Sequence, residues 1–385
     1  MLPTLLRRVP LAACILLVAP LSACQADKGG GTPTVAAAAT PQVTVPGWRA
    51  GDPVSVGGVN AKDGEELFTV VSVAEDPEGR FYVLNVGDKR ILVFDTAGTH
   101  LRTLGHEGRG PGEFVAPRTL APVGSDGLYV LDLMQRRISR FRRSDGRHLS
   151  DVTVGAWKKQ MPYDMRASLG GAVAVEFRPG PTIGGGRGNP GLVPVDTITG
   201  EVRAAEAVEI DTVRRFEATS EQGKARRVQL MDAPFAARPV WAVDQRGAFV
   251  FGTGSEYAVF RAEQGKVQEV FRRPAEPLLP VTNRDREEWF GQPTRESLRG
   301  KVSFPKHKPF YAALLVDPAG LVWLNVPSGS PGRMWAVHDG SGRSLGKVTF
   351  APGQRLMHVS RGSMYVVETD EDGVETLHRF RLSRA

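Results

Sequence analysis

The sequence is poor in cysteine and histidine and has few long apolar runs. Its only cysteines are Cys14 and Cys24, too few for a disulfide-stabilised scaffold. The seven histidines are dispersed without the spacing of zinc ligands, and the motif H-E-x-x-H does not occur. Apart from one short run near the N-terminus, no stretch of about 20 apolar residues is found, so we expect the rest of the chain to be soluble.

An excess of charge of one sign is also missing. Lysine and arginine number 49 against 42 aspartates and glutamates, and the basic residues are scattered along the chain. Nucleic-acid binding depends on clustered positive charge, so we expect no nucleic-acid partner. Glycine and proline are abundant, with 44 and 28 residues and no three-residue period. This composition predicts many turns and short strands rather than helices.

The first 23 residues have the pattern of a secretory signal peptide. Arg7 and Arg8 precede an apolar run over 9–21 that is too short to span a membrane, and small residues follow it. The sequence L-S-A-C at 21–24 resembles the lipobox of bacterial lipoproteins. This resemblance implies cleavage before Cys24 and acylation of its thiol. The alternative is an ordinary secretory signal with a chance cysteine.

Residues 24–47 are expected to form a flexible tether, because they are small, polar or Pro/Gly and lack a hydrophobic period. Gln25 stands where an aspartate would resemble an inner-membrane retention signal, so we expect an outer-membrane lipoprotein of the bacterial cell envelope. The sequence leaves open whether it faces the periplasm or the outside. With Cys14 discarded and Cys24 acylated, no disulfide forms. We expect a monomer whose membrane contact is its lipid anchor.

From residue 48 onward one unit recurs: an apolar strand, a glycine turn, a second apolar strand, a polar loop and a third strand. The turn glycines of the six copies are Gly79, Gly127, Gly171, Gly247, Gly320 and Gly362. The shorter intervals between them fit one four-stranded blade each, and the longer ones fit a blade plus an insertion. Six copies predict an all-β, six-bladed β-propeller over 48–385. Pairing of residues 53–58 with the C-terminal blade is expected to close the ring.

The run GEFVAPRTLAPVGSDGLYVLDLMQRRISRFRRSDG at 112–146 resembles the NHL repeat. It contains the repeat's G-x-F-x-x-P and R-I-x-x-F, and its D-G-L-Y-V-L-D at 126–132 is similar to the repeat's D-G-x-h-Y-V-x-D, in which h is apolar. The likeness is close over 70–154, clear over 312–351 and loose elsewhere, and the copy beginning at Tyr163 departs most. The chain as a whole resembles the six-bladed NHL-like propeller lipoproteins of bacteria, most of which have no assigned activity.

Oxygen-bearing side chains follow the second strands of five copies. They are Asn85, Asp132, Glu176, Asn325 and Glu368. In such propellers the loops at these positions share one face around the central channel. The gluconolactonase-like relatives hold calcium there with oxygen ligands, so an axial calcium ion is one hypothesis, and no other cofactor is expected. The alternative is that Asn85 and Asp132 brace their own loops by hydrogen bonds to backbone.

Basic side chains on the same loops are predicted to make this face attractive to an anionic ligand. The candidates for ligand contact are Lys89, Arg136, Arg178, Arg187 and Arg333, together with His106, Glu107 and Arg109. Arg90 and Arg137 are interpreted instead as structural arginines of the repeat. The insertions 178–191, 205–235 and 275–306 are further expected sources of specificity.

Residues 105–114, GHEGRGPGEF, have the glycine content of a phosphate-binding loop, but they precede a strand rather than a helix. We therefore predict a connection between two blades, in which glycines permit the turn and Phe114 is buried between the blades. His106, Glu107 and Arg109 are expected at the channel mouth.

Two functions follow from these observations. The first is a lipid-anchored envelope propeller, without catalytic activity, that binds a protein, peptide or glycan through its channel face. The second is a metal-dependent hydrolase or lyase of the gluconolactonase or amidating-lyase kind, with calcium or zinc on the axis.

Overall fold

The repeat copies of the sequence fold into six antiparallel sheets that follow one another along the chain. The computed structural model describes residues 38–179, 189–210, 215–222, 225–274, 277–291, 293–328 and 333–384. The predicted signal peptide, Cys24 and Arg187 lie outside the described residues.

The first three blades contain four strands each. Blade 1 contains β3 (Val70–Glu75), β4 (Phe81–Asn85), β5 (Arg90–Phe94) and β6 (His100–Leu104). Blade 2 contains β7 (Pro117–Val123), β8 (Gly127–Asp132), β9 (Arg137–Arg142) and β10 (His148–Thr153). Blade 3 contains β11 (Met161–Ala167), β12 (Val173–Arg178), β13 (Gly191–Pro194) and β14 (Val208–Glu209).

The last three blades repeat this order, and two of them also take up strands from the N-terminal part of the chain. Blade 4 contains β17 (Val240–Val243), β18 (Phe249–Gly252), β19 (Ala258–Glu263) and β20 (Lys266–Arg272). Blade 5 contains β21 (Ala313–Val316), β22 (Val322–Val326), β23 (Arg333–His338), β24 (Ser344–Phe350) and β1 (Gln42–Val43). Blade 6 contains β25 (Gln354–Val359), β26 (Ser363–Thr369), β27 (Glu375–Arg384) and β2 (Trp48–Gly57).

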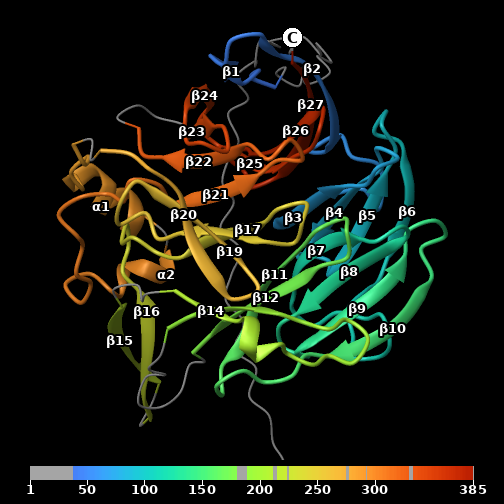
Figure 1. Cartoon of the computed structure of the whole chain (residues 1–385), viewed down its shortest axis with the longest axis horizontal. Coiled ribbons are helices and arrows are strands. Elements are labelled where there is room, and N and C mark those ends of the chain that lie inside the picture. Colours follow the sequence, from blue (N-terminus) through green and yellow to red (C-terminus); the bar gives the residue numbers. More distant parts are fainter. Residues whose placement is uncertain are drawn as a thin grey trace, which may run out of the picture. The chain divides into compact units, whose positions relative to one another are not determined.

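The first strand of every blade lies at the centre of the molecule. The strands β3, β7, β11, β17, β21 and β25 each contact the first strands of the two neighbouring blades, so that they form a closed ring. Figure 1 shows the six sheets arranged around this ring. The predicted six-bladed β-propeller is therefore confirmed, and the weakly matching third and sixth copies form complete blades.

Buried apolar side chains of the described residues form six clusters, one between each pair of neighbouring blades. The second strand of each blade explains this pattern, because successive residues of a strand point to opposite faces of the sheet. In β4, Phe81 and Val83 pack toward blade 6, whereas Tyr82 and Leu84 pack toward blade 2. Both faces of the strand are covered, so its apolar residues run unbroken.

The ring is closed by β2, which adds an outer strand to blade 6. Pro53 lies opposite Phe380, and Gly57 lies opposite Thr376 in β27. Side chains support the pairing, since Ser55 Oγ and His378 Nδ1 lie 2.8 Å apart. The predicted closure by residues 53–58 is confirmed within one residue.

The last part of the segment predicted as a tether belongs to the propeller instead. Val43 in β1 pairs with Val348 at the edge of β24, and Val45 is buried in the cluster between blades 5 and 6. The amide of Gln354 also donates a hydrogen bond to the carbonyl oxygen of Ala39 at 2.9 Å. Residues 42–43 pair with the outer edge of β24, which would otherwise be unpaired. The pairing gives hydrogen-bond partners to backbone N–H and C=O groups of both strands.

The structure adds three smaller units outside the blades. A short 3-10 helix, η1 (Ala204–Glu206), lies in blade 3, and a hairpin of β15 (Arg215–Gln222) and β16 (Ala225–Asp232) follows that blade. The helices α1 (Asn283–Phe290) and α2 (Pro293–Glu296) lie between blades 4 and 5, and Thr282 caps α1 through a capping box with Asp285. None of the helices in the described part of the chain has the length and apolarity needed to cross a bilayer.

Candidate functional site

The ring of inner strands encloses a channel made of two connected cavities. The wider cavity, of about 600 Å³, extends to the side where the inner strands begin, and residues of all six blades line it. The narrower one, of about 450 Å³, is lined by the last residues of these strands and the turns after them. The residues that line both are Pro122, Ala167, Val243, Val316 and His358.

Charged side chains of the wider cavity form two ion pairs. On β11, Arg166 lies 2.9 Å from the carboxylate of Asp164. On β25, Arg355 pairs with Glu375, whose other carboxylate oxygen accepts a hydrogen bond from the backbone N–H of Val70. Asp164 and Glu375 are therefore each paired with an arginine, so neither charge is left without a partner of opposite sign.

Arg118 on β7 is the third arginine of the wider cavity. Its guanidinium carbon lies 5.2 Å from the centre of the Tyr163 ring, a cation–π contact. No carboxylate of the described residues lies within ion-pair distance of Arg118. Among the described residues that line the wider cavity, Arg118 is therefore the arginine without an acidic partner.

Next to this cavity, Glu176 of β12 is buried between blades 3 and 4. Its carboxylate contacts the guanidinium of Arg178 and accepts a hydrogen bond from the indole N–H of Trp241 at 3.0 Å. Burial raises the pKa of Glu176, and the nearby Asp164 acts in the same direction. Arg178 also stacks on Tyr163, with its guanidinium carbon 3.6 Å from the ring centre. Glu176 thus joins two blades and orients Arg178.

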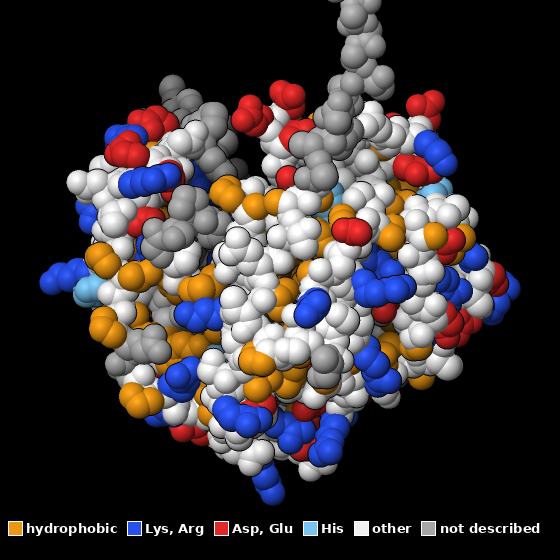
Figure 2. All heavy atoms as spheres, turned by 90° about the horizontal axis from the view of Figure 1, so that it is seen from above, with side chains coloured by type: hydrophobic (Ala, Val, Ile, Leu, Met, Phe, Trp, Pro, Cys, Tyr) orange, Lys and Arg blue, Asp and Glu red, His pale blue; other side chains and the backbone are white. Residues whose placement is uncertain are grey.

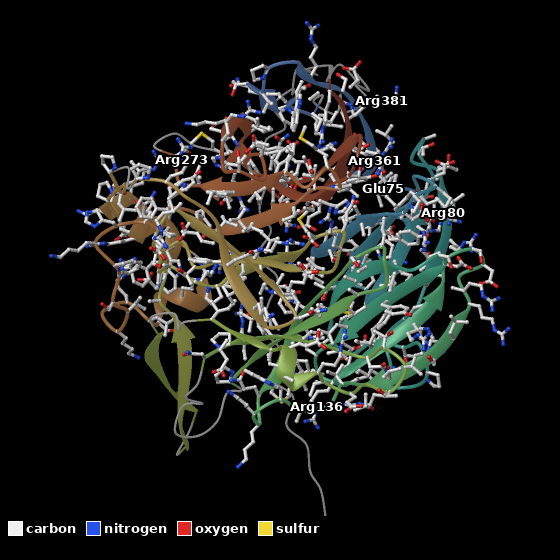
Figure 3. The ribbon with its side chains drawn as sticks, in the orientation of Figure 1. Glu75, Arg80, Arg136, Arg273, Arg361 and Arg381 are labelled. Carbon is white, nitrogen blue, oxygen red and sulfur yellow. The ribbon has the colours of Figure 1, made fainter. Side chains whose placement is uncertain are left out.

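His358 lies where the two cavities meet. Burial in the channel lowers the pKa of its imidazole to about 4, because the charged form loses its hydration. The ring is therefore neutral at pH 7, and its centre lies 5.8 Å from that of Tyr365. The narrower cavity beyond it is lined by Glu75 and Arg361, among other residues, and Figure 3 shows these two close to each other.

Of the five residues predicted as axial oxygen ligands, Asn85 and Asp132 brace their own loops. The side-chain oxygen of Asn85 accepts a hydrogen bond from the N–H of Phe68 at 2.7 Å. One carboxylate oxygen of Asp132 accepts from the N–H groups of Val115 and Ala116 at 2.7 and 3.0 Å. The bracing role, given above as the alternative for both residues, is therefore the one that their contacts show.

The other three side chains also have protein partners. Asn325 donates to the carbonyl oxygen of Met334 at 3.2 Å, Glu368 accepts from Gln354 at 2.9 Å, and Glu176 is held as described above. In the part of the chain that the structure describes, no three His, Cys, Asp or Glu side chains are grouped as ligands of one ion. Each of the five side chains thus contacts protein groups, and axial calcium stays a prediction.

A family model described as DUF5128, 6-bladed beta-propeller, matches residues 63–158. The propeller is similar in structure to a member of the DUF4221 family from Bacteroides vulgatus, with a TM-score of 0.52, 12% identity, and coverage of 88% of this chain and 98% of that one. A putative exported protein from Bacteroides fragilis gives a TM-score of 0.51 and 10% identity, covering 89% and 97%. At these identities the likenesses show the fold alone. No relative is found among curated proteins.

The described residues predicted for ligand contact do not line the channel, although Arg178 lies beside it against Tyr163. Lys89 pairs with Glu107, and His106 Nε2 lies 3.2 Å from Glu113. Arg109, Arg136 and Arg333 are exposed, and Figure 3 shows Arg136 near the edge of the molecule. None of these described candidates, nor Arg178, lines either cavity of the channel.

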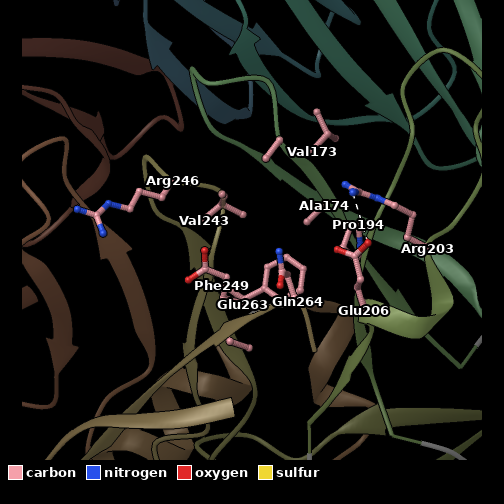
Figure 4. Close-up of a pocket in the computed structure, with 13 residues that line it drawn as sticks. Val173, Ala174, Pro194, Arg203, Glu206, Val243, Arg246, Phe249, Glu263 and Gln264 are labelled. Carbon is pink, nitrogen blue, oxygen red and sulfur yellow. Dashed lines mark ion pairs between the residues drawn. The ribbon is translucent and has the colours of Figure 1, made fainter. Parts of the chain in front are cut away.

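Basic side chains do not form a continuous patch on the side of the propeller shown in Figure 2. There, lysines and arginines lie among acidic and apolar side chains. A cavity of about 190 Å³ lies between blades 3 and 4. Figure 4 shows the residues that line it. The charges of Arg203 and Glu206 face each other there at 3.4 Å. The channel is therefore the stronger candidate for a site.

The segment 105–114 is the predicted connection between two blades. It leads from β6 to β7, and the N–H of Phe114 donates to the carbonyl oxygen of His106 at 2.8 Å. Gly105 has a φ of 68°, and a Cβ there would lie 2.2 Å from the Phe114 ring. Arg137 fastens the segment by donating to the carbonyl oxygens of Gly110 and Glu113. The predicted burial of Phe114 and the structural role of Arg137 are both confirmed.

A serine motif of the chain also finds a structural explanation. Residues 342–346 match G-x-S-x-G, the pattern of a nucleophile elbow, which requires a turn from a strand into a helix. In the propeller the motif joins β23 to β24, and Ser344 begins the second of these strands. It therefore forms part of a hairpin.

Sequence reasoning missed the charged and titratable residues of the inner strands. They are Arg118, Asp164, Arg166, Arg355 and His358. A signal for them exists, because each interrupts an apolar first strand, as in RTLAPV, YDMRA and RLMHV. A buried strand in a propeller favours apolar residues, so charges inside its innermost strands indicate a polar channel.

Proposed function

We propose that the propeller is an exported, lipid-anchored binding module of the bacterial cell envelope. Its ligand is a protein, peptide or glycan that places a negatively charged group in the wider part of the channel. The observation that carries the proposal is Arg118, which lines a cavity of about 600 Å³ and has no carboxylate partner among the described residues.

The contacts of the wider cavity support an anionic ligand over a cationic one. Its carboxylates, Asp164 and Glu375, already face Arg166 and Arg355. A cation would have to compete for them, whereas an anion meets the unpaired guanidinium of Arg118. A guanidinium binds a carboxylate or phosphate through two parallel hydrogen bonds, and the partly enclosed site strengthens that interaction relative to bulk water.

Replacing Arg118 by glutamine tests this site directly. We expect the purified full-length variant to retain its fold, because Arg118 makes no ion pair within the described residues, but to bind ligand about 10- to 100-fold more weakly. The measurement compares the peptides, glycans and proteins that wild type and variant retain from envelope fractions, followed by titration of the retained species.

The matched control is Arg147→Gln, since Arg147 is exposed in the turn before β10, away from the channel. Equal retention by wild type, Arg118→Gln and the control would contradict the proposal, as would a ligand without negative charge. The metal-dependent hydrolase remains the alternative outcome. A stoichiometric calcium or zinc ion in the purified wild-type protein would replace the binding module as the preferred function.

The anchoring part of the proposal is tested at Cys24. We expect Cys24→Ser to move the protein from the membrane fraction to the soluble fraction, because serine has no thiol to acylate. Cell fractionation with immunoblotting provides the measurement, and Cys14→Ser is the matched control, since Cys14 lies in the predicted signal peptide. A Cys24→Ser protein that stays in the membrane fraction would show that the lipid is not its anchor.

A further inference from the structure

A separate cavity of about 410 Å³ lies beside blade 5, outside the channel. Three parts of the chain build it: residues 233–238 after the inserted hairpin, the helical insertion with α1 and α2, and the segments that flank β21 and β22. It shares no lining residue with either cavity of the channel. The insertions between the blades therefore form, together with blade 5, a cavity that is separate from the channel.

Aromatic side chains form one part of the lining. Phe235 and Trp289 line the cavity, and Phe304 supports both, with ring centres 6.3 Å from Phe235 and 5.7 Å from Trp289. Phe235 has a φ of 57°, a strained backbone conformation that a bulky residue rarely adopts. The surrounding contacts hold the ring there despite this strain. Two flat apolar surfaces are thus fixed at the cavity.

Positive charge forms the other part. Arg238, Arg295 and Lys308 line the cavity. Lys308 is neutralised by Asp285, with its Nζ 2.6 Å from the carboxylate. Arg238 and Arg295 have no carboxylate within ion-pair distance among the described residues, and Arg295 instead stacks on Trp289 at 5.0 Å from the ring centre. Two guanidinium groups without an acidic partner among the described residues therefore line the cavity, and one of them stacks on an aromatic ring.

We infer that this cavity binds a small anion whose carboxylate is carried on a ring, such as a sugar acid or an aromatic acid. The carboxylate meets Arg238 and Arg295, because a planar guanidinium matches its two oxygens. The ring of the ligand lies against Phe235 or Trp289, since aromatic faces pack on other aromatic rings and on the apolar face of a sugar. The site is independent of Arg118 and of the function proposed for the channel.

Four probes separate the two parts of this recognition. Glucuronate and benzoate carry both a carboxylate and a ring, glucose has a ring without charge, and acetate has a carboxylate without a ring. We expect saturable binding of glucuronate or benzoate to the full-length protein by calorimetry, at least about tenfold tighter than that of glucose or acetate. Preference between glucuronate and benzoate identifies the ligand as a sugar acid or an aromatic acid.

Variants then locate the binding. Arg238→Gln and Arg295→Gln are each expected to weaken binding of the preferred probe at least about tenfold, and added salt is expected to weaken it in the wild type. Arg147→Gln is the control and should bind as wild type does. The inference is overturned if glucose or acetate binds as tightly, if both cavity variants bind normally, or if no probe binds saturably.

Discussion

Replacing Asp76 by alanine is expected to lower the free energy of unfolding by about 3–5 kcal/mol. Asp76 directly follows the first strand of blade 1, and its carboxylate is fully buried. Arg143, with 1% of its side chain exposed, reaches this carboxylate from blade 2 at 3.3 Å. Alanine would leave the arginine buried with only the half-exposed Glu78 as an acidic partner, because a guanidinium does not lose its proton at ordinary pH.

The other contacts of Asp76 add to the cost. The hydroxyl of Tyr82 donates to it at 2.8 Å, and Arg80 Nε does so at the same distance. Burial, together with the hydrogen bond to Asp76, raises the pKa of Tyr82, so the phenol remains a donor. Asp76 therefore links blades 1 and 2 and stabilises the turn that follows β3. Urea unfolding of the purified variant measures the combined contribution of these contacts to stability.

Asp95 provides a matched control in the same blade. Its carboxylate accepts hydrogen bonds from the N–H groups of Ala97 and Thr99 at 2.9 and 2.8 Å, as Asp76 does in its own turn. No arginine of the described residues lies within ion-pair distance of Asp95. We expect Asp95→Ala to cost about 1 kcal/mol. Equal losses for the two variants would show that the buried arginine contributes nothing.

Phe114→Ala is expected to cost about 3–5 kcal/mol, because truncation removes a fully buried ring and leaves a cavity between blades 1 and 2. The ring packs near Phe141, with the two centres 6.0 Å apart, and against the backbone of Gly105. No Cβ is present at Gly105 to move into the space, so the cavity cannot collapse easily. Chemical unfolding measures the loss.

Phe68 serves as the control for Phe114. It also precedes an inner strand, but 45% of its side chain is exposed to solvent. Phe68→Ala is expected to change stability by less than about 1 kcal/mol. If Phe114→Ala were as mild as this control, the inter-blade segment 105–114 would not be the firm connection that its contacts indicate.

The fold was predictable because it depends on a repeated local pattern. Each copy has unbroken apolar residues in its second strand and a glycine turn before it, and both features are set by neighbours within one copy. The role of β1 was not predictable in this way. Val43 pairs with Val348 across about 300 residues of sequence, and two valines in a Pro/Gly-rich stretch give no local indication of that partner.

The candidate site was harder to predict because its residues are brought together by the ring. Arg118 and Tyr163 belong to different blades, and Arg355 finds Glu375 on another strand of blade 6. Arg136 and His106 do lie in loops, as predicted. Their distance from the channel, however, depends on the conformation of each loop, which the repeat pattern does not specify. A repeat pattern predicts which strand is innermost and says less about the direction of its loops.

The pairing of β2 with β27 has a consequence for the order in which the molecule can be completed. Ser55 and His378 are 323 positions apart, so one strand of the closing pair is among the first parts of the propeller to be synthesised and the other is among the last. Until the final residues arrive, β2 lacks its partner strand and keeps an unpaired edge that could join another chain. Closing so long a loop is also slow. A growing or translocating chain therefore needs protection for the whole time of its synthesis, after which a single step seals the ring.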